Sequence, residues 1–340
     1  MTETPMVSVI MNCFDGETYL PEALDSVLAQ TFEDWEIVFW DNQSTDRSAE
    51  IFKSYADPRF RYWYAPDHTL LYEARNYAIE QARGEFIAFL DTDDWWLPQK
   101  LEKQLPLFSD PSVGFTCTNF WVASLLRNKT WLALTRSVPT GWVLHELLRR
   151  NSVALVTLMV RRSALESLDY HCDPRYHIIG DFDLVLRLAE NWKMDYLTEP
   201  VAVNREHWSN ETRKDPGRLA REMTVWLKEA KEREPMASSP NLRYVEWNLT
   251  YSRAMHMIHS GERSAARRLF GELPWGRNKL RLLAALLFPR LVGRRVRGRK
   301  RPTAALVGDE YPPYGPVGSG PQRPLVDRSG QGLDSSPGEE

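Results

Sequence analysis

The stretch FIAFLDTDDWWLP at residues 86–98 joins an apolar run to three aspartates and two tryptophans. The apolar run at 86–90 is typical of a strand buried on both faces of a sheet. Carboxylates crowded at its end repel one another and lose solvation. A divalent cation would relieve this repulsion, because Mg²⁺ and Mn²⁺ prefer oxygen ligands and often join carboxylates to phosphates. The residues alone leave an alternative open, in which Asp93 or Asp94 caps a helix that begins near Leu97.

The first hundred residues alternate between strand-like and helix-like periods, which predicts strand and helix units wound around a parallel sheet. The predicted strands are 6–11, 36–40, 61–64 and 86–90, and the predicted helices are about 19–30, 45–55 and 71–82. Ligands of open α/β sheets bind outside the carboxyl ends of the strands. We therefore expect three polar clusters to converge there: 12–15, 41–42 and 91–94.

Two residue types suggest where the predicted helices begin and end. Ser44 or Thr45 is a candidate cap for the second helix. Gly84 is expected to end the third helix in a left-handed conformation.

The remainder of the chain is less regular. We expect a helix to residue 108, strands near 113–119 and 154–160, a helix at 181–191 and mostly helical structure over 218–270. This predicts four parts: an α/β domain over 1–215, a helical extension over 216–275, a basic amphipathic segment over 276–301 and a tail over 302–340. The tail is rich in Pro, Gly, Ser and acidic residues, and we expect it to be disordered.

Composition narrows the possible classes of protein. A chain of 340 residues with 43% hydrophobic residues is globular. Its formal net charge of −3 argues against a nucleic-acid binder. Three cysteines without a CxxC pair favour a reducing compartment over a disulfide framework or a thiolate metal site. We expect no secretory signal, and the apolar run at 282–288 is far shorter than the roughly 20 residues that span a bilayer.

Residues 276–301 combine apolar residues at helical spacing with a dense block of Arg and Lys. Polybasic segments of this kind favour anionic membrane surfaces, at roughly 1 kcal/mol for each basic residue near the lipid. The alternative is a solvated helix and tail. On the first interpretation, we expect the protein to be cytoplasmic and to lie peripherally on the cytoplasmic face of a membrane.

Two long blocks of the sequence resemble the family-two glycosyltransferases with a GT-A fold. They are VSVIMNCFDGETYLPEALDSVLAQTFEDWEIVFWDNQSTD at 7–46 and ARNYAIEQARGEFIAFLDTDDWWLPQKLEKQ at 74–104. The resemblance is close over about the first 110 residues and looser to about residue 212. It implies that the predicted domain at 1–215 is a GT-A glycosyltransferase domain, with a mixed, mostly parallel sheet flanked by helices.

The resemblance also implies an activity. Family members take a sugar from a nucleotide-diphosphate sugar with Mg²⁺ or Mn²⁺ and pass it to a hydroxyl with inversion. The expected acceptor is a saccharide or a lipid-linked molecule in cell-surface polysaccharide or glycolipid synthesis.

The family's motifs transfer to particular residues here. Asp91-Thr92-Asp93 resembles the DXD motif, which implies Asp93 as metal ligand, Asp91 at the ribose or the metal, Thr92 at the nucleotide and Asp94 as support. Arg75 matches a position near the nucleotide; its alternative is an exposed helix charge.

Further nucleotide contacts are implied at the first two strand ends. They are Cys13, Phe14 and Asp15 at the first and Asp41 and Asn42 at the second. The aromatic ring of Phe14 can stack on a base, as the tyrosine usual in the family would.

An inverting transfer needs a base that takes a proton from the attacking hydroxyl. Asp181 matches the family's catalytic base, with Gly180 in place of the usual glutamate; the alternative is a helix cap. Asp183 would point away from Asp181 on a helix and is expected to cap or support.

The stretch 203–212 resembles a flexible loop of the family. It makes His207, and less so Arg205, a candidate contact to the metal or the diphosphate. The alternative is a polar surface residue. Trp95 and Trp96 could form a sugar platform, but Trp96 is expected in the core.

Two other functions remain possible from the sequence. One is a non-catalytic, membrane-associated assembly protein that binds sugar nucleotides. The other is a sugar-phosphate nucleotidyltransferase, which the acidic stretch at 13–17 disfavours because a basic, Gly-rich loop would be expected there.

Overall fold

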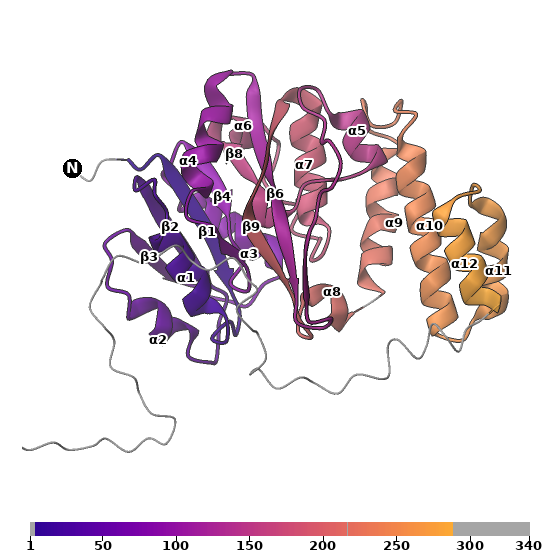
Figure 1. Ribbon diagram of the computed structural model, residues 1–340, viewed down its shortest axis with the longest axis horizontal. Helices are drawn as coiled ribbons and strands as arrows, with labels where there is room; N and C mark the ends of the chain where they lie inside the picture. Colours follow the sequence, from indigo (N-terminus) through magenta and orange to yellow (C-terminus); the bar gives the residue numbers. More distant parts are fainter. Residues whose placement is uncertain (1–3, 216, 288–340) are drawn as a thin grey trace, which may run out of the picture.

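The computed structural model describes residues 4–215 and 217–287. Its first half confirms the predicted strand and helix units (Figure 1). Four parallel strands lie in the order β3-β2-β1-β4. Their bounds are β1 Val7–Cys13, β2 Trp35–Asp41, β3 Phe60–Tyr64 and β4 Phe86–Phe89. The helices between them are α1 Leu20–Leu28, α2 Ser48–Lys53 and α3 Leu71–Glu80.

The second half of the sheet is mixed. It adds β5 Trp95–Trp96, β6 Val113–Ser124, β7 Lys129–Leu132, β8 Met159–Arg161 and β9 Lys193–Glu206. From β4 the order continues β8-β6-β9-β5, with β7 paired to β6. In this half β6 and β9 run parallel, whereas the other pairings are antiparallel. The predicted parallel character therefore holds for the first four strands.

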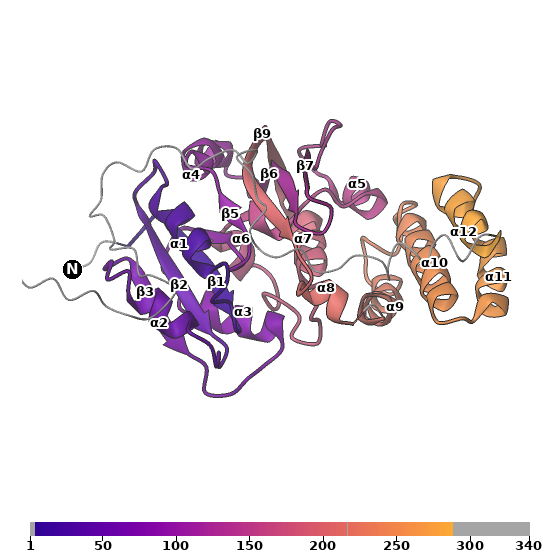
Figure 2. The ribbon, with the colours of Figure 1, turned by 60° about the horizontal axis from the view of Figure 1, so that its bottom comes forward.

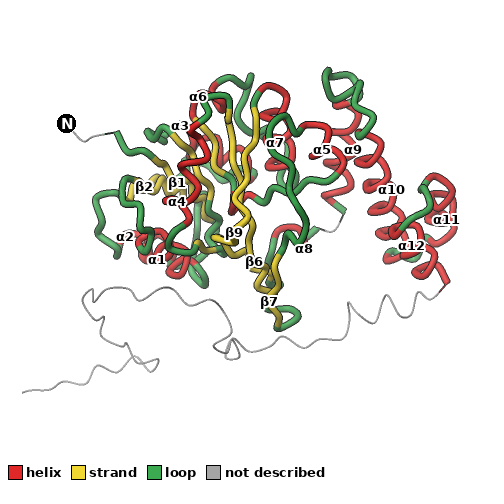
Figure 3. The backbone as a smooth tube through the Cα atoms, turned by 45° about the horizontal axis from the view of Figure 1, so that its top comes forward, coloured by secondary structure: helices red, strands yellow, loops and turns green. Residues whose placement is uncertain are grey.

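Helices cover the sheet and then continue beyond it at one end of the molecule (Figures 2 and 3). Those of the second half of the sheet domain are α4 Lys100–Gln104, η1 Leu105–Ser109, α5 Leu144–Arg149, η2 Leu155–Thr157, α6 Arg162–Glu166 and α7 Gly180–Asn191. The following ones are α8 Glu211–Lys214, α9 Arg218–Ala230, α10 Leu242–His259, α11 Arg263–Glu272 and α12 Arg277–Leu287. Over 4–215 and 217–287, none of the helices is long and apolar enough to span a membrane.

The last two parts predicted from the sequence are described only in part. Of the basic segment expected at 276–301, the structure describes the residues up to 287, which include α12. Residues 288–301 and the tail expected at 302–340 lie outside the described residues.

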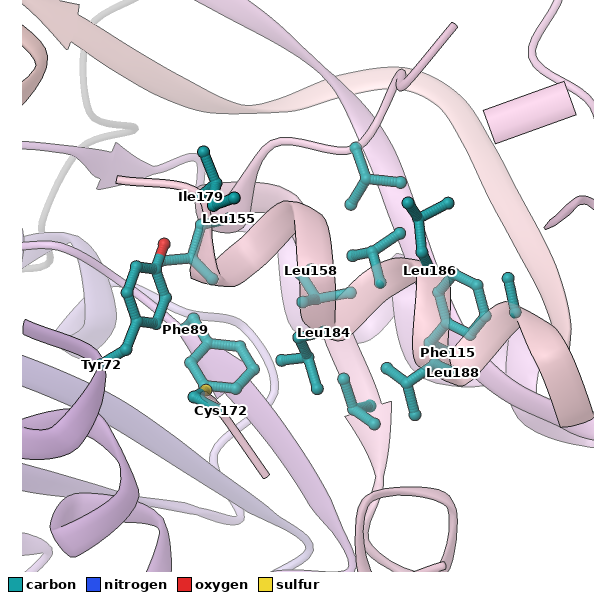
Figure 4. Close-up of a cluster of buried hydrophobic side chains, with 14 of the residues drawn as sticks. Tyr72, Phe89, Phe115, Leu155, Leu158, Cys172, Ile179, Leu184, Leu186 and Leu188 are labelled. Carbon is teal, nitrogen blue, oxygen red and sulfur yellow. The ribbon is translucent and has the colours of Figure 1, made fainter. Parts of the chain in front are cut away.

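Two hydrophobic cores lie on opposite faces of the sheet, because side chains alternate along each strand. On β1, Val7, Val9 and Met11 face one core, and Ile10 faces the other. The second of these cores extends to α7, where Leu184 and Leu188 pack with Phe115 of β6 (Figure 4). This core fixes the beginning of α7 relative to the carboxyl ends of the parallel strands.

Three local predictions were wrong. Gly84 does not end α3 in a left-handed conformation, because the helix ends at Glu80 with Gln81 as a right-handed cap. A Cβ on Gly84 would instead lie 2.5 Å from the backbone nitrogen of Ser8, so the close approach to β1 requires glycine there.

The other two concern α2 and the stretch 154–160. At α2 it is Asp46, not Ser44 or Thr45, whose carboxylate accepts from the helix's first N–H, that of Ser48, at 2.9 Å. The predicted strand at 154–160 is mostly a 3₁₀ turn, followed by the short β8.

A buried lysine gives the fold a pH dependence. Lys100 is fully buried, donates to Oε1 of Gln104 at 2.8 Å and lies 4.1 Å from the Trp96 ring centroid. Burial lowers its pKa to about 7. An unfolded lysine has a pKa of about 10.4, so between these values the unfolded state binds more protons and stability rises with pH, by at most about 1.4 kcal/mol per pH unit.

We expect Lys100→Met to remove this rise. The free energy of unfolding, measured by urea titration at pH 7, 8 and 9, should increase with pH less in Lys100→Met than in the wild type. The partly exposed Lys103 of the same helix provides the control Lys103→Met, which should keep the wild-type slope. Parallel curves for all three proteins would contradict the prediction.

Candidate active site

Three carboxylates meet in the loop between β4 and β5. Ligand oxygens of Asp91, Asp93 and Asp94 all lie within 4.8 Å of one another. The next helix, α4, begins at Lys100 with Gln99 at its cap position, so these aspartates do not cap it. Burial raises the pKa of Asp91 against the opposing charge of Arg75. Burial, then the charges of Asp93 and Asp91, raise the pKa of Asp94 well above its usual range. Crowded oxygen ligands of this kind fit Mg²⁺ or Mn²⁺.

Strand β9 fastens Asp94 in place. Its carboxylate is buried and accepts from the backbone N–H of Arg205 at 2.8 Å and from Nδ2 of Asn204 at 3.0 Å. The pairing of β5 with β9 brings these residues together, because Trp95 lies opposite Val203. Asp94 therefore anchors the loop, while Asp91 and Asp93 remain partly exposed toward the cleft.

His207 lies beside Asp93. Its Nε2 is 2.8 Å from Oδ2 of Asp93, its Nδ1 is 2.9 Å from Oγ of Ser209, and Nδ2 of Asn210 donates to the same Asp93 oxygen at 3.3 Å. His207 is 8% exposed, so it is not a polar surface residue. Asn210 was missed from the sequence, because no pattern distinguishes it in a polar loop. The carboxylates whose ligand atoms lie near enough to share a cation are Asp91, Asp93 and Asp94, and His207 adjoins them through its hydrogen bond with Asp93.

Arg205 and the two tryptophans have contacts within the protein, although Arg205 also lines the cleft. Arg205 pairs with Glu22, and its guanidinium lies 4.5 Å from the Trp95 ring centroid. Trp95 is 4% exposed and Trp96 is fully buried. The expectation that Trp96 is core is confirmed, and Trp95 as a sugar platform was wrong because its ring lies beneath Arg205.

Arg75 is buried next to the carboxylates rather than exposed on its helix. It is 1% exposed, and its Nη2 donates to Oδ1 of Asp91 at 2.6 Å. Its Nη1 is a buried atom with no hydrogen-bond partner among the described residues. Arg75 lines the cleft, so this unsatisfied N–H group lies at the cleft wall.

The end of β1 presents a second unpartnered group. Both amide atoms of Asn12 are buried without a hydrogen-bond partner among the described residues. Phe14 is 49% exposed, and its ring centroid lies 4.4 Å from that of His68. Cys13 is buried, which raises the pKa of its thiol to about 11. Sequence reasoning missed His68, which lies in a loop without periodicity.

The carboxylates at the first two strand ends differ from the prediction. Asp41 is fully buried and accepts from the N–H of Ser44 and from the hydroxyl of Tyr62, both at 2.7 Å. Asp15 accepts from the N–H of Thr45 at 2.7 Å. These two side chains hold the loop after β2, and neither lines the cleft or the pocket described below, so their contact with a nucleotide stays a prediction.

The amide of Asn42, the other predicted contact at the second strand end, is engaged by the backbone of Thr69. It donates to the carbonyl at 2.9 Å and accepts from the N–H at 3.2 Å.

Most of the predicted site residues line one cleft, which has a volume of about 620 Å³. Its lining includes Phe14, Arg75, Asp91, Thr92, Asp93, Asp181 and His207. An adjoining pocket of about 170 Å³ shares Asn12 and Phe14 with it and adds Cys13, Asn42 and His68. The predicted convergence of the strand ends is thus observed, apart from Asp15 and Asp41.

His177 connects helix α3 to the short helix α8 at the wall of this cleft, through hydrogen bonds with Leu71 and Glu211. Its Nδ1 accepts from the N–H of Leu71 at 3.3 Å, so Nε2 carries the proton toward Glu211 at 3.0 Å. This hydrogen bond and the nearby Lys214 lower the pKa of Glu211 to about 2 against the effect of burial. No sequence pattern singles out His177, because its partners Leu71 and Glu211 lie far away along the chain.

Asp181 lies in the first turn of α7 and lines the same cleft as Asp91-Thr92-Asp93, here called the DTD loop. Its Oδ1 accepts from the N–H of Phe182 at 2.8 Å. It is not a helix cap, since Ile179 holds that position. Burial raises the pKa of Asp181, although the Phe182 N–H and the Arg75 charge oppose this effect.

Asp183 points away from the cleft, as predicted from its helical spacing. Its carboxylate accepts from Nε of Arg187 at 2.8 Å and from Nε1 of Trp226 at 3.1 Å. Because Trp226 belongs to α9, Asp183 holds α9 against α7.

Gly180 accommodates the ring of Tyr72. A Cβ on Gly180 would lie 2.4 Å from Cγ of Tyr72, which is itself buried. Overpacking of this kind typically costs about 1–3 kcal/mol. The glutamate usual in the family would not fit at this position while Tyr72 occupies the space.

We expect Gly180→Ala to destabilise the protein by about 1–3 kcal/mol. In a Tyr72→Ala background the same substitution should have almost no effect, because the clashing ring is gone. A double-mutant cycle in urea unfolding measures this coupling. Equal losses in the two backgrounds would show that Tyr72 is not the cause.

Comparisons with known proteins agree with this geometry. A sequence model of the family described as "Glycosyl transferase family 2" matches residues 8–166. EpsE of Bacillus subtilis is 35% identical over 211 residues, which are 61% of this chain and 75% of EpsE. The chain belongs to glycosyl transferase family 2.

Other relatives of this family-2 chain are covered less completely. TuaG of Bacillus subtilis is 32% identical over 46% of the chain and 63% of TuaG. The Escherichia coli protein WfgD, named as a UDP-Glc:alpha-D-GlcNAc-diphosphoundecaprenol beta-1,3-glucosyltransferase, is 27% identical over 48% of the chain and 64% of WfgD. The chain thus spans a little under two thirds of the length of these two relatives.

Solved structures confirm the GT-A fold of the family-2 chain. Staphylococcus aureus TarS 1–349 in complex with UDP-GlcNAc matches with a TM-score of 0.61 at 17% identity, over 84% of this chain and 87% of that one. The mannosyltransferase PcManGT from Pyrobaculum calidifontis, in complex with GDP-Man and Mn²⁺, matches with a TM-score of 0.57 at 18% identity, over 87% and 83%.

Proposed function

We propose that the protein is a metal-dependent glycosyltransferase that moves a sugar from a nucleotide-diphosphate sugar to a hydroxyl, with inversion. The observation that carries this proposal is that one cleft contains both crowded carboxylates and polar groups without a hydrogen-bond partner among the described residues. Partly exposed carboxylates of Asp91 and Asp93 adjoin the unpartnered N–H of Arg75 and the unpartnered amide of Asn12. A cation with a polar, anionic ligand satisfies all of them at once.

The donor would lie across the carboxyl ends of the parallel strands. Phe14 and His68 offer ring faces to a base, and Asn12 and Asn42 line the same small pocket. Arg75 places a fixed positive charge next to Asp91, suited to phosphate or ribose oxygens. We therefore assign the small pocket to the base and the wall formed by Arg75 and the DTD loop to the diphosphate.

Asp91 and Asp93, with His207 beside Asp93, would hold Mg²⁺ or Mn²⁺. When bound, the ion supplies positive charge that stabilises the departing nucleoside diphosphate. Their oxygens are near enough to one another to share a cation. The complex of PcManGT with GDP-Man and Mn²⁺ supports this choice of ion.

Asp181 would act as the general base. It lines the cleft from α7, where it is partly exposed, and its raised pKa makes the carboxylate a stronger base than that of an exposed aspartate. A base in this place accepts the proton of the attacking hydroxyl on the side of the sugar opposite the leaving group, which inverts the anomeric carbon.

The proposed setting is the cytoplasmic face of a membrane, where cell-surface polysaccharide or glycolipid precursors are extended. WfgD, by its name, acts on a diphosphoundecaprenol-linked sugar. In this chain, Trp275, Leu280 and Leu287 are 74%, 57% and 63% exposed around α12, beside the exposed Arg277 and Arg281. Exposed apolar side chains flanked by arginines suit an anionic membrane surface.

Sedimentation with vesicles tests the membrane contact. We expect the full chain to bind phosphatidylglycerol vesicles and to be released by high salt. Leu280→Glu should weaken this binding. Equal sedimentation with neutral and anionic vesicles, or no binding, would contradict a basic membrane-surface segment.

Calorimetry with a panel of nucleotide sugars tests the donor site. We expect one UDP-, GDP- or dTDP-sugar to bind in Mn²⁺ and to lose its affinity in EDTA. Pyrophosphate release from a nucleoside triphosphate and a sugar phosphate would instead favour a nucleotidyltransferase. Donor binding without turnover, with acceptors present, would favour a non-catalytic binding protein.

A further inference from the structure

A second hollow adjoins the active-site cleft, between the beginning of α7 and the helices α9 and α10. It has a volume of about 300 Å³, at the lower end for ligand pockets. Figure 1 shows α9 and α10 side by side next to α7. The hollow is mostly apolar, with walls that include Ile178, Phe182, Leu219, Met223 and Leu249.

The hollow and the cleft share part of their walls. Ile178 and Asp181 line both. The carboxylate of Asp181, proposed as the base, therefore lies at the border between the polar cleft and the apolar hollow. A molecule with its hydroxyl at Asp181 would have its next atoms within reach of this hollow.

Hydrogen bonds fix the walls in position. Glu222 of α9 accepts from the backbone N–H groups of His177, Ile178 and Ile179 at 3.0, 2.9 and 3.2 Å. The bond from Trp226 to Asp183 adds a second connection between α9 and α7. The hollow is thus part of the packed structure and not a gap between loosely joined helices.

We propose that this hollow binds an apolar group of the acceptor, which makes the acceptor an amphiphilic, lipid-linked or aglycone-bearing saccharide. The inference rests on the proposed function, because it takes Asp181 as the base. A saccharide alone would place hydroxyl groups against Leu219 and Met223, where they would lose hydrogen bonds to water. An alkyl or isoprenoid group gains roughly fourfold in affinity for each methylene that it buries.

Calorimetry with n-alkyl β-glucosides, from butyl to decyl and below their micelle concentrations, tests the inference without any donor. We expect the Kd for the full chain to fall by roughly threefold to fourfold for each methylene until the hollow is filled. Leu219→Ser should flatten this dependence. Val225→Ser is the matched control, because Val225 lies on the same helix, is 46% exposed against 41% for Leu219, and does not line the hollow.

The outcomes separate this inference from the proposed function. A Kd independent of the alkyl chain length, or the same dependence in Leu219→Ser as in the wild type, would overturn the inference. Release of nucleoside diphosphate from the donor is followed independently. If no donor is turned over, the proposed function fails, whether or not the glucosides bind.

Discussion

Asp93→Ala will strongly lower metal-dependent turnover of the donor. Asp93 is the carboxylate that both adjoins His207 and remains partly exposed to the cleft, so its loss removes a ligand from the cation site. A cation that stabilises a leaving diphosphate contributes several kcal/mol, which corresponds to a fall of roughly 100- to 1000-fold in kcat/KM. Mn²⁺-dependent donor binding, measured by calorimetry, should weaken as well.

The exposed Asp169 provides a control for this substitution. Asp169→Ala should keep both donor binding and turnover. If Asp93→Ala binds Mn²⁺ and donor like the wild type, the assignment of Asp93 as a metal ligand is wrong.

Asp181→Asn will lower kcat by roughly 100- to 10,000-fold, the range for loss of a general base, and leave donor affinity nearly unchanged. The amide keeps the shape of the side chain but cannot accept the proton. Asp181 belongs to α7 and is not one of the carboxylates that could share the cation, so the donor keeps its contacts with the DTD loop. Steady-state kinetics and donor calorimetry on the same preparations separate the two effects.

The pH profile gives a second test of Asp181. Burial raises the pKa of this carboxyl, and the unprotonated form is the base. Activity should therefore fall as the pH drops, at a higher pH than the value near 3.9 of an exposed aspartate would give. If the residual activity of Asp181→Asn falls at low pH in the same way as that of the wild type, another group causes this fall.

Much of the first half of the fold could be predicted from the sequence, because its signals are local. Apolar runs such as 86–90 and helical spacing in 71–82 mark single elements, and parallel strands bring their carboxyl ends together. The closeness of the DTD loop to the end of β1 follows from these two facts.

The second half depends on contacts between distant residues. Strand β9 is long and carries charged residues, and it was missed because its pairing with β6 and β5, rather than its composition, makes it a strand. The contacts of Arg205 and His207 with the DTD loop follow from this pairing. Their roles could not be read from a stretch that resembles a loop.

Local hydrogen bonds account for the remaining differences at the site. Asp15 and Asp41 lie at the predicted strand ends, but their carboxylates accept from local donors at Thr45, Ser44 and Tyr62, and neither residue lines the cleft. Spacing along a strand places a residue at an edge. It does not decide which of two nearby sets of hydrogen-bond donors the side chain will satisfy.

The most direct test of the central claim is release of nucleoside diphosphate from the bound nucleotide sugar, compared in Mn²⁺ and in EDTA for the wild type, Asp93→Ala and Asp181→Asn. The account predicts release by the wild type in Mn²⁺ but not in EDTA, at least roughly 100-fold slower release with weaker donor binding in Asp93→Ala, and at least roughly 100-fold slower release with donor binding retained in Asp181→Asn. Release that is independent of metal, or that persists at the wild-type rate in both variants, would contradict it.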